Sequence, residues 1–302
     1  MTNPSSEADI HPASITVCAP AKINLVLRIL DRRPDGYHNL WSLMQTVRLE
    51  DELSLSISHT HSVITLGCDD PSLKTDSSNL VYRAAAAVLE QSKQTVGLDI
   101  TLTKRIPMGA GLGGGSSDAA ATIIGLNRLL KLGWSPEEMA QVGQTLGSDV
   151  PFFFFAPSAT VAGRGDKVMS VRITGSRWVV LVNPSFPVET KWAYRQLSES
   201  RTGVVPVSRS HAALEALPEL SWKQVLKTAE NDFEAPVFNA YPLLRDIKQE
   251  FTARGAEVAL LSGSGATVFG VFYNEAKARR AHASFQNERK FKVFVTQTCL
   301  SS

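Results

Sequence analysis

The stretch Pro107-Met108-Gly109-Ala110-Gly111-Leu112-Gly113-Gly114-Gly115-Ser116-Ser117-Asp118-Ala119-Ala120 holds five glycines within seven positions, directly before a predicted helix. Glycine lets the backbone adopt a positive φ and lets its N–H groups approach a ligand closely. The start of a helix adds unpaired N–H donors and the positive end of the helix dipole. We therefore predict an anion site here, best suited to a polyphosphate. The hydroxyls of Ser116 and Ser117 would serve phosphate oxygens or a metal ion.

Two better-known glycine motifs fit this stretch less well. Gly109, Gly111 and Gly114 have the dinucleotide-binding spacing, but a second helix rather than a strand follows, and no acidic residue stands about 20 positions later at a strand end. An ordinary P-loop needs a lysine where Gly115 stands. A flexible linker is the remaining alternative, although linkers rarely separate a strand from a strongly apolar helix.

Outward from this loop, the periodicity predicts a mixed α+β protein. Before the loop we predict β structure, with a helix capped by Asn79 between strands. After it we predict a helix with Ser135 as N-cap, Pro136 at its first position and Glu138 closing a capping box. The same periodicity and turn signals predict strands at 23–29, 40–49, 53–57, 63–66, 98–104, 178–182, 258–261, 267–272 and 291–295. They also predict a helix at 119–130 and helices that begin at 190 and at 242.

Turns and helix ends are predicted from composition. Residues 31–36 are expected to form a turn, and residues 200–218 a loop or linker. Gly147 is expected to end its helix in the left-handed conformation. Gly255 is placed just past another helix end. The aromatic run Phe152–Phe155 is expected to belong to the core rather than to a ligand site.

Composition narrows the class of protein. The chain has 302 residues, 31 basic and 29 acidic, so its charge offers no support for a nucleic-acid or anionic-membrane partner. The polar residues 1–13 are expected to be a disordered lead without a signal sequence. No apolar run approaches the roughly 20 residues that span a bilayer. Three unpaired cysteines suggest neither a disulfide framework nor a zinc site. We expect a cytoplasmic protein, a monomer or weak homodimer.

The loop Pro-x-x-x-Gly-Leu-Gly followed by serines and alanines resembles the nucleotide-phosphate loop of the GHMP kinases. This resemblance implies a two-lobed α+β fold, with a ribosomal protein S5-like N-terminal domain at 14–173 and a ferredoxin-like α/β C-terminal domain at 174–302. It also implies ATP bound on the loop, with Mg²⁺ carried by the nucleotide and protein ligands that the sequence does not fix. The implied ATP-binding residues are Asn79, Pro107, Gly109, Ala110, Gly111, Leu112, Gly113, Gly114, Gly115, Ser116 and Ser117.

Three further segments resemble one branch of these kinases: Ala19–Leu25, Gly36–Leu40 and Leu146–Phe153. The branch phosphorylates the 2-hydroxyl of 4-diphosphocytidyl-2-C-methyl-D-erythritol, a cytidine diphosphate derivative, in the non-mevalonate route to isoprenoid precursors. The alternatives are another GHMP kinase, acting on homoserine or mevalonate, and a non-catalytic nucleotide-binding regulator. Gly36-Tyr37-His38 argues against the former, because those small substrates offer no base to stack on. The presence of Lys22 and Asp149 argues against the latter.

Phosphoryl transfer to an alcohol needs a phosphate cradle, a positioned hydroxyl and a group that takes its proton. Asp149, after a helix end and before an apolar run, is the candidate base, and Lys22 could supply the opposing charge. From the residues alone, Asp149 could instead be an N-cap and Lys22 a solvated lysine at a strand end. The resemblance assigns both to the acceptor hydroxyl.

The resemblance further implies an acceptor site read by aromatic residues. Tyr37 would stack on the cytosine, His38 would hydrogen-bond its polar edge, and Tyr194 would cover the other face. Asn24 and Thr190 would complete this site with neutral hydrogen bonds. The loop Ser262–Gly265 is expected to pack against the phosphate loop, with a simple tight turn as the alternative. Asp166 stands where the branch leads us to expect glutamate.

Overall fold

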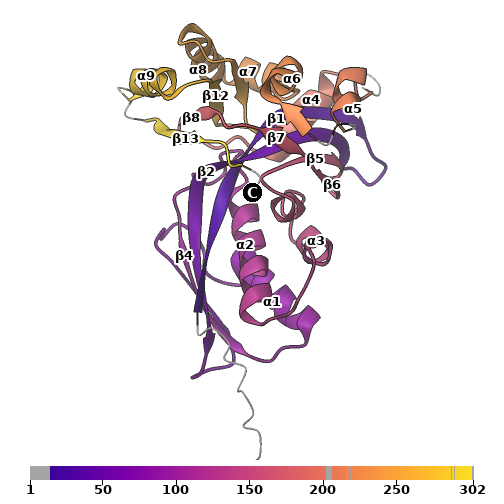
Figure 1. The fold of residues 1–302 in the computed structure, drawn as a ribbon, viewed down its shortest axis with the longest axis vertical. Helices are drawn as coiled ribbons and strands as arrows, with labels where there is room; N and C mark the ends of the chain where they lie inside the picture. The colour runs from indigo at the N-terminus through magenta and orange to yellow at the C-terminus, as the bar shows by residue number, and fades with distance from the viewer. Residues whose placement is uncertain are drawn as a thin grey trace, which may run out of the picture.

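The structure is a computed structural model that describes residues 14–201, 206–215, 217, 219–286, 288 and 290–300. The predicted disordered lead, residues 1–13, lies outside the described residues. Figure 1 shows an elongated molecule in which the first half of the chain forms the lower part and most of the second half forms the upper part. Two main sheets organise these parts, and each is covered by helices.

The first sheet is built on two long antiparallel strands, β1 (Ser14–Arg32) and β2 (His38–Ser58), joined by a turn that contains Gly36 at φ 84°. Its strand order is β10-β1-β2-β4-β3, with β5 and β6 continuing from β2. The remaining strands are β3 (Ile64–Cys68), β4 (Gly97–Thr103), β5 (Ser158–Gly163), β6 (Lys167–Ser170) and β10 (Glu230–Asn231).

Helices α1 (Leu80–Ser92), α2 (Gly114–Leu129) and α3 (Pro136–Gln144) lie beside this sheet (Figure 1). The predicted caps are confirmed. The Asn79 side chain accepts a hydrogen bond from the backbone N–H of Val81 at 2.8 Å, and Ser135 forms both halves of a capping box with Glu138. The short 3₁₀ helix η1 (Pro151–Phe154) packs its aromatic side chains into the same core, as predicted.

The second sheet is antiparallel, in the order β11-β12-β8-β13. Its strands are β8 (Trp178–Asn183), β11 (Val258–Leu261), β12 (Val268–Phe272) and β13 (Lys292–Gln297). The helices of this part are α4 (Thr190–Glu199), α5 (Arg209–Glu215), α6 (Trp222–Thr228), α7 (Glu234–Ala240), α8 (Pro242–Ala253) and α9 (Glu275–Phe285). A small parallel pair, β7 (Arg172–Thr174) and β9 (Glu219–Ser221), completes it.

Strand β1 is the element shared by both parts. Its residues from Ala21 to Leu27 are all buried, so the alternation of a half-exposed strand is lost there. Ile23 and Leu25 pack in a core with Val179 and Leu181 of β8. The polar residues on this stretch are therefore also buried, which determines the environment of Lys22 and Asn24.

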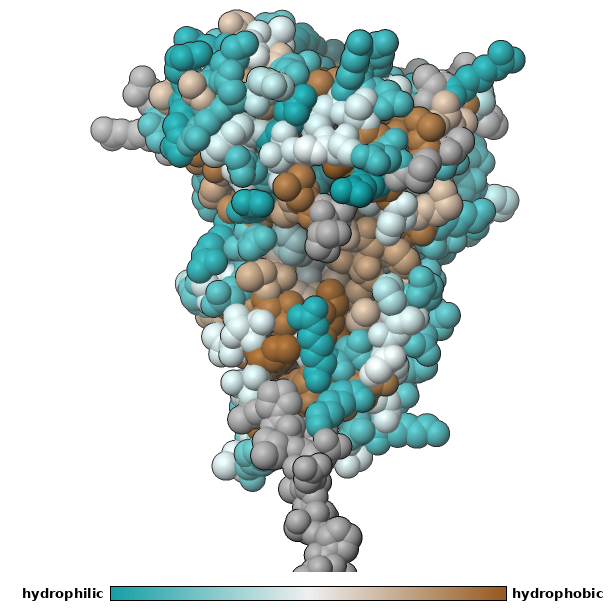
Figure 2. All heavy atoms as spheres, viewed as in Figure 1, coloured by the Kyte–Doolittle hydropathy of each residue, from teal (hydrophilic) through white to brown (hydrophobic). Residues whose placement is uncertain are grey.

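The surface differs between the two parts. Figure 2 shows that, on the face seen in Figure 1, hydrophilic side chains cover much of the upper part while hydrophobic ones gather in the middle and lower part. Within the described residues, no helix combines the length and the apolar character needed to cross a membrane.

Two predicted boundaries were wrong near the first sheet and the glycine-rich loop. The strands expected at 40–49 and 53–57 form the single strand β2, because Glu50, Asp51 and Glu52 between them continue the pairing with β1. Within this strand, the pairing of β2 with β1 shifts register between Pro20 and Ala21 of β1. Helix α2 begins at Gly114 rather than at 119. A Cβ at Gly114 would lie 3.1 Å from Ile106 Cγ2, so glycine here permits close packing inside the first helical turn.

Two further predictions were wrong. Gly147 does not adopt a positive φ, and α3 ends earlier, at Gln144, with Thr145 in the right-handed conformation. The segment expected as a loop at 200–218 contains α5. The polar composition of this segment gave no sign of a helix, although two side chains three positions apart, His211 and Leu214, are both buried.

Candidate active site

The glycine-rich loop contains three glycines in the left-handed backbone conformation, and it packs against a second glycine-containing loop. Gly109, Gly111 and Gly113 have φ values of 61°, 75° and 70°. A Cβ on Gly111 would lie 2.0 Å from the carbonyl oxygen of Ser262, so only glycine fits there. The Ser262 hydroxyl donates to the Gly111 carbonyl at 2.8 Å. The predicted packing of the loop Ser262–Gly265, between β11 and β12, against this loop is confirmed.

A cavity of about 580 Å³ lies along this loop and the start of α2. Of the residues predicted to bind ATP, the ones that line it are Asn79, Pro107, Gly109, Ala110, Gly111, Leu112, Gly113, Gly114, Gly115 and Ser116. Ser117 differs, because its side chain is buried and its hydroxyl has no hydrogen-bond partner among the described residues. Backbone donors at the start of α2 and the absence of side chains at the glycines suit this cavity to an anionic chain such as a triphosphate.

Lys22 and Asp149 meet beside the loop, although 127 positions separate them in the sequence. The backbone N–H of Lys22 donates to the Leu112 carbonyl at 2.9 Å. A Cβ on Gly113 would lie 2.9 Å from Lys22 Cγ, so this glycine leaves room for the lysine side chain. Lys22 Nζ lies 3.3 Å from Asp149 Oδ2, and the two side chains are 4% and 37% exposed. A buried cation therefore faces a carboxylate that solvent or a substrate can reach.

Asn24 lies deeper than an acceptor-binding role would suggest, since it is 1% exposed. Its Oδ1 accepts hydrogen bonds from Lys22 Nζ at 2.8 Å and from the backbone N–H of Gly263 at 3.0 Å. Its Nδ2 donates to the Ser42 hydroxyl at 2.9 Å. In this arrangement Asn24 anchors the lysine rather than presenting a free amide.

The predicted base-reading residues are only partly grouped. The rings of His38 and Tyr194 stack with centroids 4.8 Å apart, and His38 Nε2 lies 2.9 Å from the Ser198 hydroxyl. Tyr37 stands apart, 57% exposed, with the Arg164 guanidinium 4.8 Å from the centre of its ring. Thr190 Oγ1 lies 2.9 Å from Ser264 Oγ, on the second glycine loop.

Burial sets the protonation of two of these rings. It lowers the pKa of His38, with a further lowering from Arg32 and an opposing effect from Asp31, so His38 is neutral at pH 7. Burial also raises the pKa of Tyr194, and the negative charge of Asp149 adds to the rise. The effect of Asp149 on Tyr194 shows that the aromatic pair lies near the lysine–aspartate pair.

A second charged group near the loop was missed by the sequence reasoning. Lys104 Nζ contacts Asp51 Oδ2 and lies 2.7 Å from Asp118 Oδ2. All three side chains are at most 6% exposed, and Lys104 and Asp118 line the cavity. Burial raises the pKa of the Asp118 carboxyl to about 7, with Lys104 opposing the rise and Asp51 adding to it. The only local signal was a charged residue directly before the apolar Ala119 and Ala120.

Comparison with known proteins accounts for this arrangement. The GHMP kinases N-terminal domain family matches residues 79–156, and the GHMP kinases C-terminal family matches residues 213–290. A curated 4-diphosphocytidyl-2-C-methyl-D-erythritol kinase from Geobacter metallireducens is 42% identical over 283 residues, which are 93% of this chain and 97% of the relative. A protein of the same name from Syntrophotalea carbinolica is 41% identical over 92% of this chain and 97% of its own length.

The chain belongs to the 4-diphosphocytidyl-2-C-methyl-D-erythritol kinase family of GHMP kinases.

Solved structures agree with this membership. A crystal structure of a 4-(cytidine 5'-diphospho)-2C-methyl-D-erythritol kinase superimposes with a TM-score of 0.77 at 32% identity, over 95% of this chain and all of the other. A homoserine kinase from Cytophaga hutchinsonii has a TM-score of 0.73 at 19% identity, over 99% of this chain and 97% of the other, which shows the fold alone. The expected two-lobed GHMP kinase fold is thereby confirmed.

Proposed function

We propose that this GHMP kinase transfers the γ-phosphoryl group of ATP to the 2-hydroxyl of 4-diphosphocytidyl-2-C-methyl-D-erythritol, giving the 2-phosphate and ADP. The observation that carries the proposal is the 3.3 Å approach of Lys22 Nζ to Asp149 Oδ2, directly beside the glycine loop. This supports a site where an alcohol is activated at the end of a bound triphosphate.

In this mechanism the loop holds the phosphates and the lysine–aspartate pair handles the alcohol. The backbone N–H groups at the start of α2 would bind phosphate oxygens. Asp149 Oδ2 would accept the hydroxyl proton as the oxygen attacks phosphorus. Lys22 Nζ would stabilise the developing negative charge on that oxygen. Because Lys22 is buried and anchored by Asn24, it needs little reorganisation during transfer.

Mg²⁺ is expected to arrive with ATP. Within the residues that the structure describes, His, Cys, Asp and Glu side chains nowhere form a group of three or more that could hold a metal. Asp118 lines the cavity, and in the part of the chain that the structure describes its Oδ1 has no hydrogen-bond partner. These residues fit an ion whose ligands are mostly phosphate oxygens and water, with Asp118 as the candidate carboxylate. When bound, Mg²⁺ would neutralise charge on the transferring phosphates.

The acceptor's cytosine is proposed to lie near the aromatic residues. Tyr37 would stack on the base, His38 would hydrogen-bond its edge and Tyr194 would cover the other face, with Thr190 nearby. In the structure His38 already occupies one face of Tyr194, so base binding would require these two rings to separate or to share the base edge-on. The neutral state of His38 favours a hydrogen bond to an uncharged base.

The other proposals concern the protein as a whole. We propose domains at 14–173 and 174–302, and an enzyme that acts in the cytoplasm as a monomer or weak homodimer without nucleic-acid or membrane partners. The near balance of 31 basic and 29 acidic residues supports the absence of a polyanionic partner.

The test is an assay of ATP-dependent ADP release with each candidate acceptor. We expect turnover with 4-diphosphocytidyl-2-C-methyl-D-erythritol and none with homoserine or mevalonate. Phosphorus NMR of the product should place the new phosphate on the 2-hydroxyl. Turnover with homoserine or mevalonate, and none with the cytidyl compound, would overturn the proposal.

A further inference from the structure

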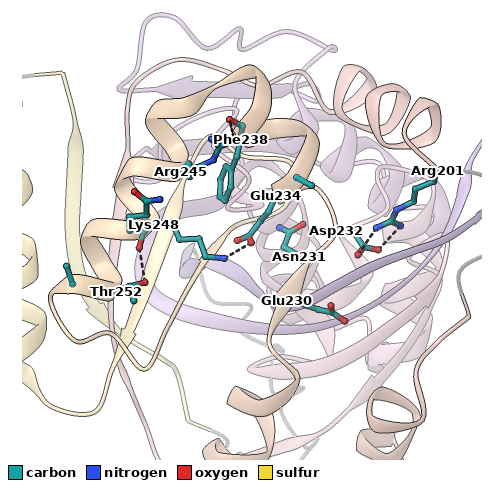
Figure 3. Close-up of a pocket in the computed structure, with 12 residues that line it drawn as sticks. Arg201, Glu230, Asn231, Asp232, Glu234, Phe238, Arg245, Lys248 and Thr252 are labelled. Carbon is teal, nitrogen blue, oxygen red and sulfur yellow. Dashed lines mark hydrogen bonds and ion pairs between the residues drawn. The ribbon is translucent and has the colours of Figure 1, made fainter.

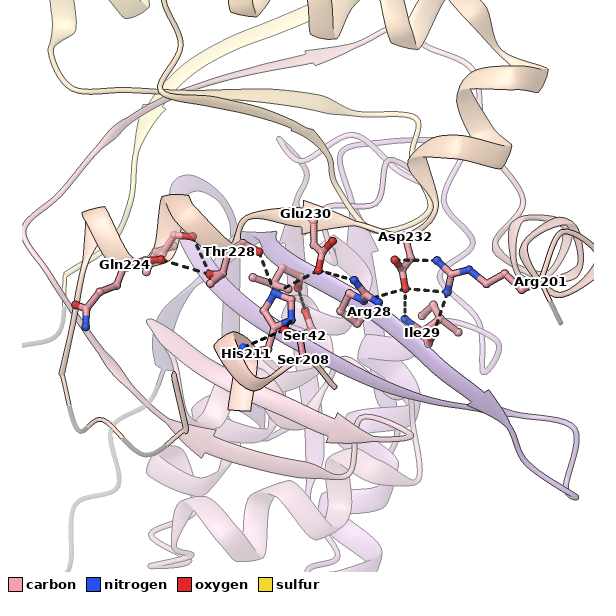
Figure 4. Close-up of polar contacts among 12 residues, drawn as sticks. Arg28, Ile29, Ser42, Arg201, Ser208, His211, Gln224, Thr228, Glu230 and Asp232 are labelled. Carbon is pink, nitrogen blue, oxygen red and sulfur yellow. Dashed lines mark hydrogen bonds and ion pairs between the residues drawn. The ribbon is translucent and has the colours of Figure 1, made fainter. Parts of the chain in front are cut away.

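The segment Glu230–Glu234 joins the two parts of the molecule next to the active site. Strand β10 pairs in parallel with β1, through Val26 with Glu230 and Leu27 with Asn231. Figure 4 shows Arg28 between Glu230 and Asp232, with Arg201 on the far side of Asp232. Arg28 Nη1 lies 2.7 Å from Glu230 Oε1, and Arg201 Nη2 lies 2.8 Å from Asp232 Oδ1.

Asn231 is the residue of this segment that reaches the second glycine loop. Its Nδ2 donates to the carbonyl oxygens of Leu261 at 2.7 Å and Gly263 at 2.8 Å. Its Oδ1 accepts from the backbone N–H of Phe233 at 2.9 Å. An amide group has two N–H donors, and both are used on this loop. Asn231 is 6% exposed, so water does not compete freely for these bonds.

The same segment forms one wall of a cavity of about 880 Å³ (Figure 3). Glu234 and Lys248 in that wall are paired with each other at 2.5 Å, and Glu234 also accepts from the Leu261 N–H at 3.0 Å. The segment is therefore fixed on the cavity side by an ion pair and on the active-site side by the Asn231 amide.

The backbone of Gly263 connects Asn231 to Asn24 and Lys22 through hydrogen bonds. Its carbonyl oxygen is held by Asn231, and its N–H donates to Asn24 Oδ1 at 3.0 Å. The same Oδ1 accepts from Lys22 Nζ at 2.8 Å. A Cβ on Gly263 would lie 3.6 Å from Lys22 Nζ, so this peptide group stands directly against the lysine head.

We propose that Asn231 is a positioning residue for phosphoryl transfer: by fixing both ends of the Leu261–Gly263 turn, it holds Asn24 and thereby places the Lys22 ammonium opposite Asp149. This inference rests on the proposed function, and it adds a residue that touches neither reactant. A displacement of about 1 Å at a reacting group can reduce the rate of transfer by up to about 100-fold.

The first experiment is a double-mutant cycle on kcat. Asn231→Ala should lower kcat by about 10- to 100-fold while the KM for ATP changes less than twofold. In the Asn24→Ala background, the same substitution should lower kcat by less than about threefold, because its route to Lys22 is already broken. If the two effects multiply, Asn231 does not act through Asn24 and the proposal is wrong.

The second experiment needs no substrate. Amide hydrogen exchange of the peptide containing Gly263 should be at least about tenfold faster in Asn231→Ala than in the wild-type protein. Unchanged exchange would overturn the proposal. If the wild-type protein phosphorylates none of the acceptors, the proposed function fails, but this measurement still decides whether Asn231 holds Gly263.

Asp232→Asn is the matched control. Asp232 lies in the same segment, and its side chain pairs with Arg28 and Arg201 and accepts from the Ile29 N–H. Among the described residues, none of its hydrogen bonds or ion pairs reaches the second glycine loop, so the substitution weakens the segment elsewhere. We expect it to lower Tm at least as much as Asn231→Ala, and to leave kcat and Gly263 exchange within threefold of wild type. If Asp232→Asn lowers kcat equally at temperatures well below its Tm, the role of Asn231 is merely structural.

A milder variant covers the case in which Asn231→Ala does not fold. Asn231→Ser keeps one donor on a shorter side chain, so we expect an intermediate loss of kcat and intermediate Gly263 exchange. Wild-type values for both in this variant would overturn the proposal.

Discussion

Two lysine–aspartate groups lie beside the glycine-rich loop, and they differ in burial and in charge balance. Lys22 faces one aspartate, Asp149, which is 37% exposed. Lys104 faces two carboxylates, Asp51 and Asp118, in a group where no side chain is more than 6% exposed. Asp51 also accepts from the backbone N–H groups of Arg105 and Ile106. The first pair is therefore partly open to solvent, whereas the second is buried at the base of the loop.

The contrast shows how the same two residue types take different roles. In a buried group, loss of one partner leaves an uncompensated charge, which is strongly destabilising. In a partly exposed pair, solvent screens the remaining charge, so loss of a partner costs little stability. Changes at Lys22–Asp149 should therefore act on turnover, and changes at Lys104 on folding.

The largest expected effect is on turnover at the exposed aspartate. Asp149→Asn should lower kcat by about 10³-fold, within the usual 10²–10⁴ range for general-base help, because the amide cannot accept the hydroxyl proton. ATP affinity, measured by calorimetry, should change little. Asp246→Asn, at an exposed position on α8, is the control and should keep wild-type kcat. Normal turnover in Asp149→Asn would remove this residue from the mechanism.

Substitution of Lys104, whose partners are both buried, should have the next largest effect, a loss of stability. Lys104→Met should lower the free energy of unfolding by about 3–5 kcal/mol, because it leaves two buried carboxylates without their cation. Lys22→Met should lower it by about 1 kcal/mol while abolishing most turnover. Urea denaturation followed by tryptophan fluorescence measures the free energy of unfolding of the two variants. Equal losses of stability in the two variants would contradict the contrast.

The third prediction concerns pH. Burial raises the pKa of Asp118 to about 7, so the folded state binds this proton more tightly than the unfolded state does. The resulting stability is fully present below about pH 4 and is lost as the pH rises through about 7. Since the rise is from 3.8 to about 7, at about 1.4 kcal/mol per pKa unit the loss is on the order of 4 kcal/mol.

Asp118→Asn isolates this contribution. Urea denaturation at several pH values between 5 and 8 should show the variant gaining stability relative to wild type as the pH rises. Parallel pH profiles for the two proteins would show that Asp118 does not carry the raised pKa.

The smallest expected effect concerns the exposed aromatic residue, away from both charged groups. Tyr37→Ala should raise the acceptor KM by about tenfold, since an aromatic stack is worth roughly 0.5–1.5 kcal/mol. The KM for ATP should stay constant, and Tyr37→Phe should behave like wild type. An unchanged acceptor KM in Tyr37→Ala would place the cytosine elsewhere.

The sequence predicted the parts of the site that carry local signals. Clustered glycines before a helix predicted a phosphate loop, and family motifs predicted a pairing of Lys22 with Asp149, which the structure brings within 3.3 Å. The group of Lys104 with Asp51 and Asp118 left no such signal, because its members meet only through tertiary packing across 67 positions of sequence.

Local signals also failed where burial overrides them. Asn24 looked like a free hydrogen-bonding residue on a strand, but β1 is enclosed on both sides and its amide is used internally. Gly147 looked like a helix end in the left-handed conformation, but α3 already ends at Gln144 and Gly147 has no positive φ. In both cases the neighbours that decide the outcome are set by the fold rather than by adjacent sequence.

The pairing of β10 with β1 has a consequence for the order in which the protein is made. Lys22 leaves the ribosome before the residues that hold it in place. Glu230 and Asn231, which pair with β1, and Gly263, which anchors Asn24, follow more than 200 residues later. Contacts between such distant positions form late and slowly. A nascent chain therefore carries the glycine-rich loop well before Asn231 and Gly263 have emerged, and the contacts that hold Asn24 and Lys22 are completed only then.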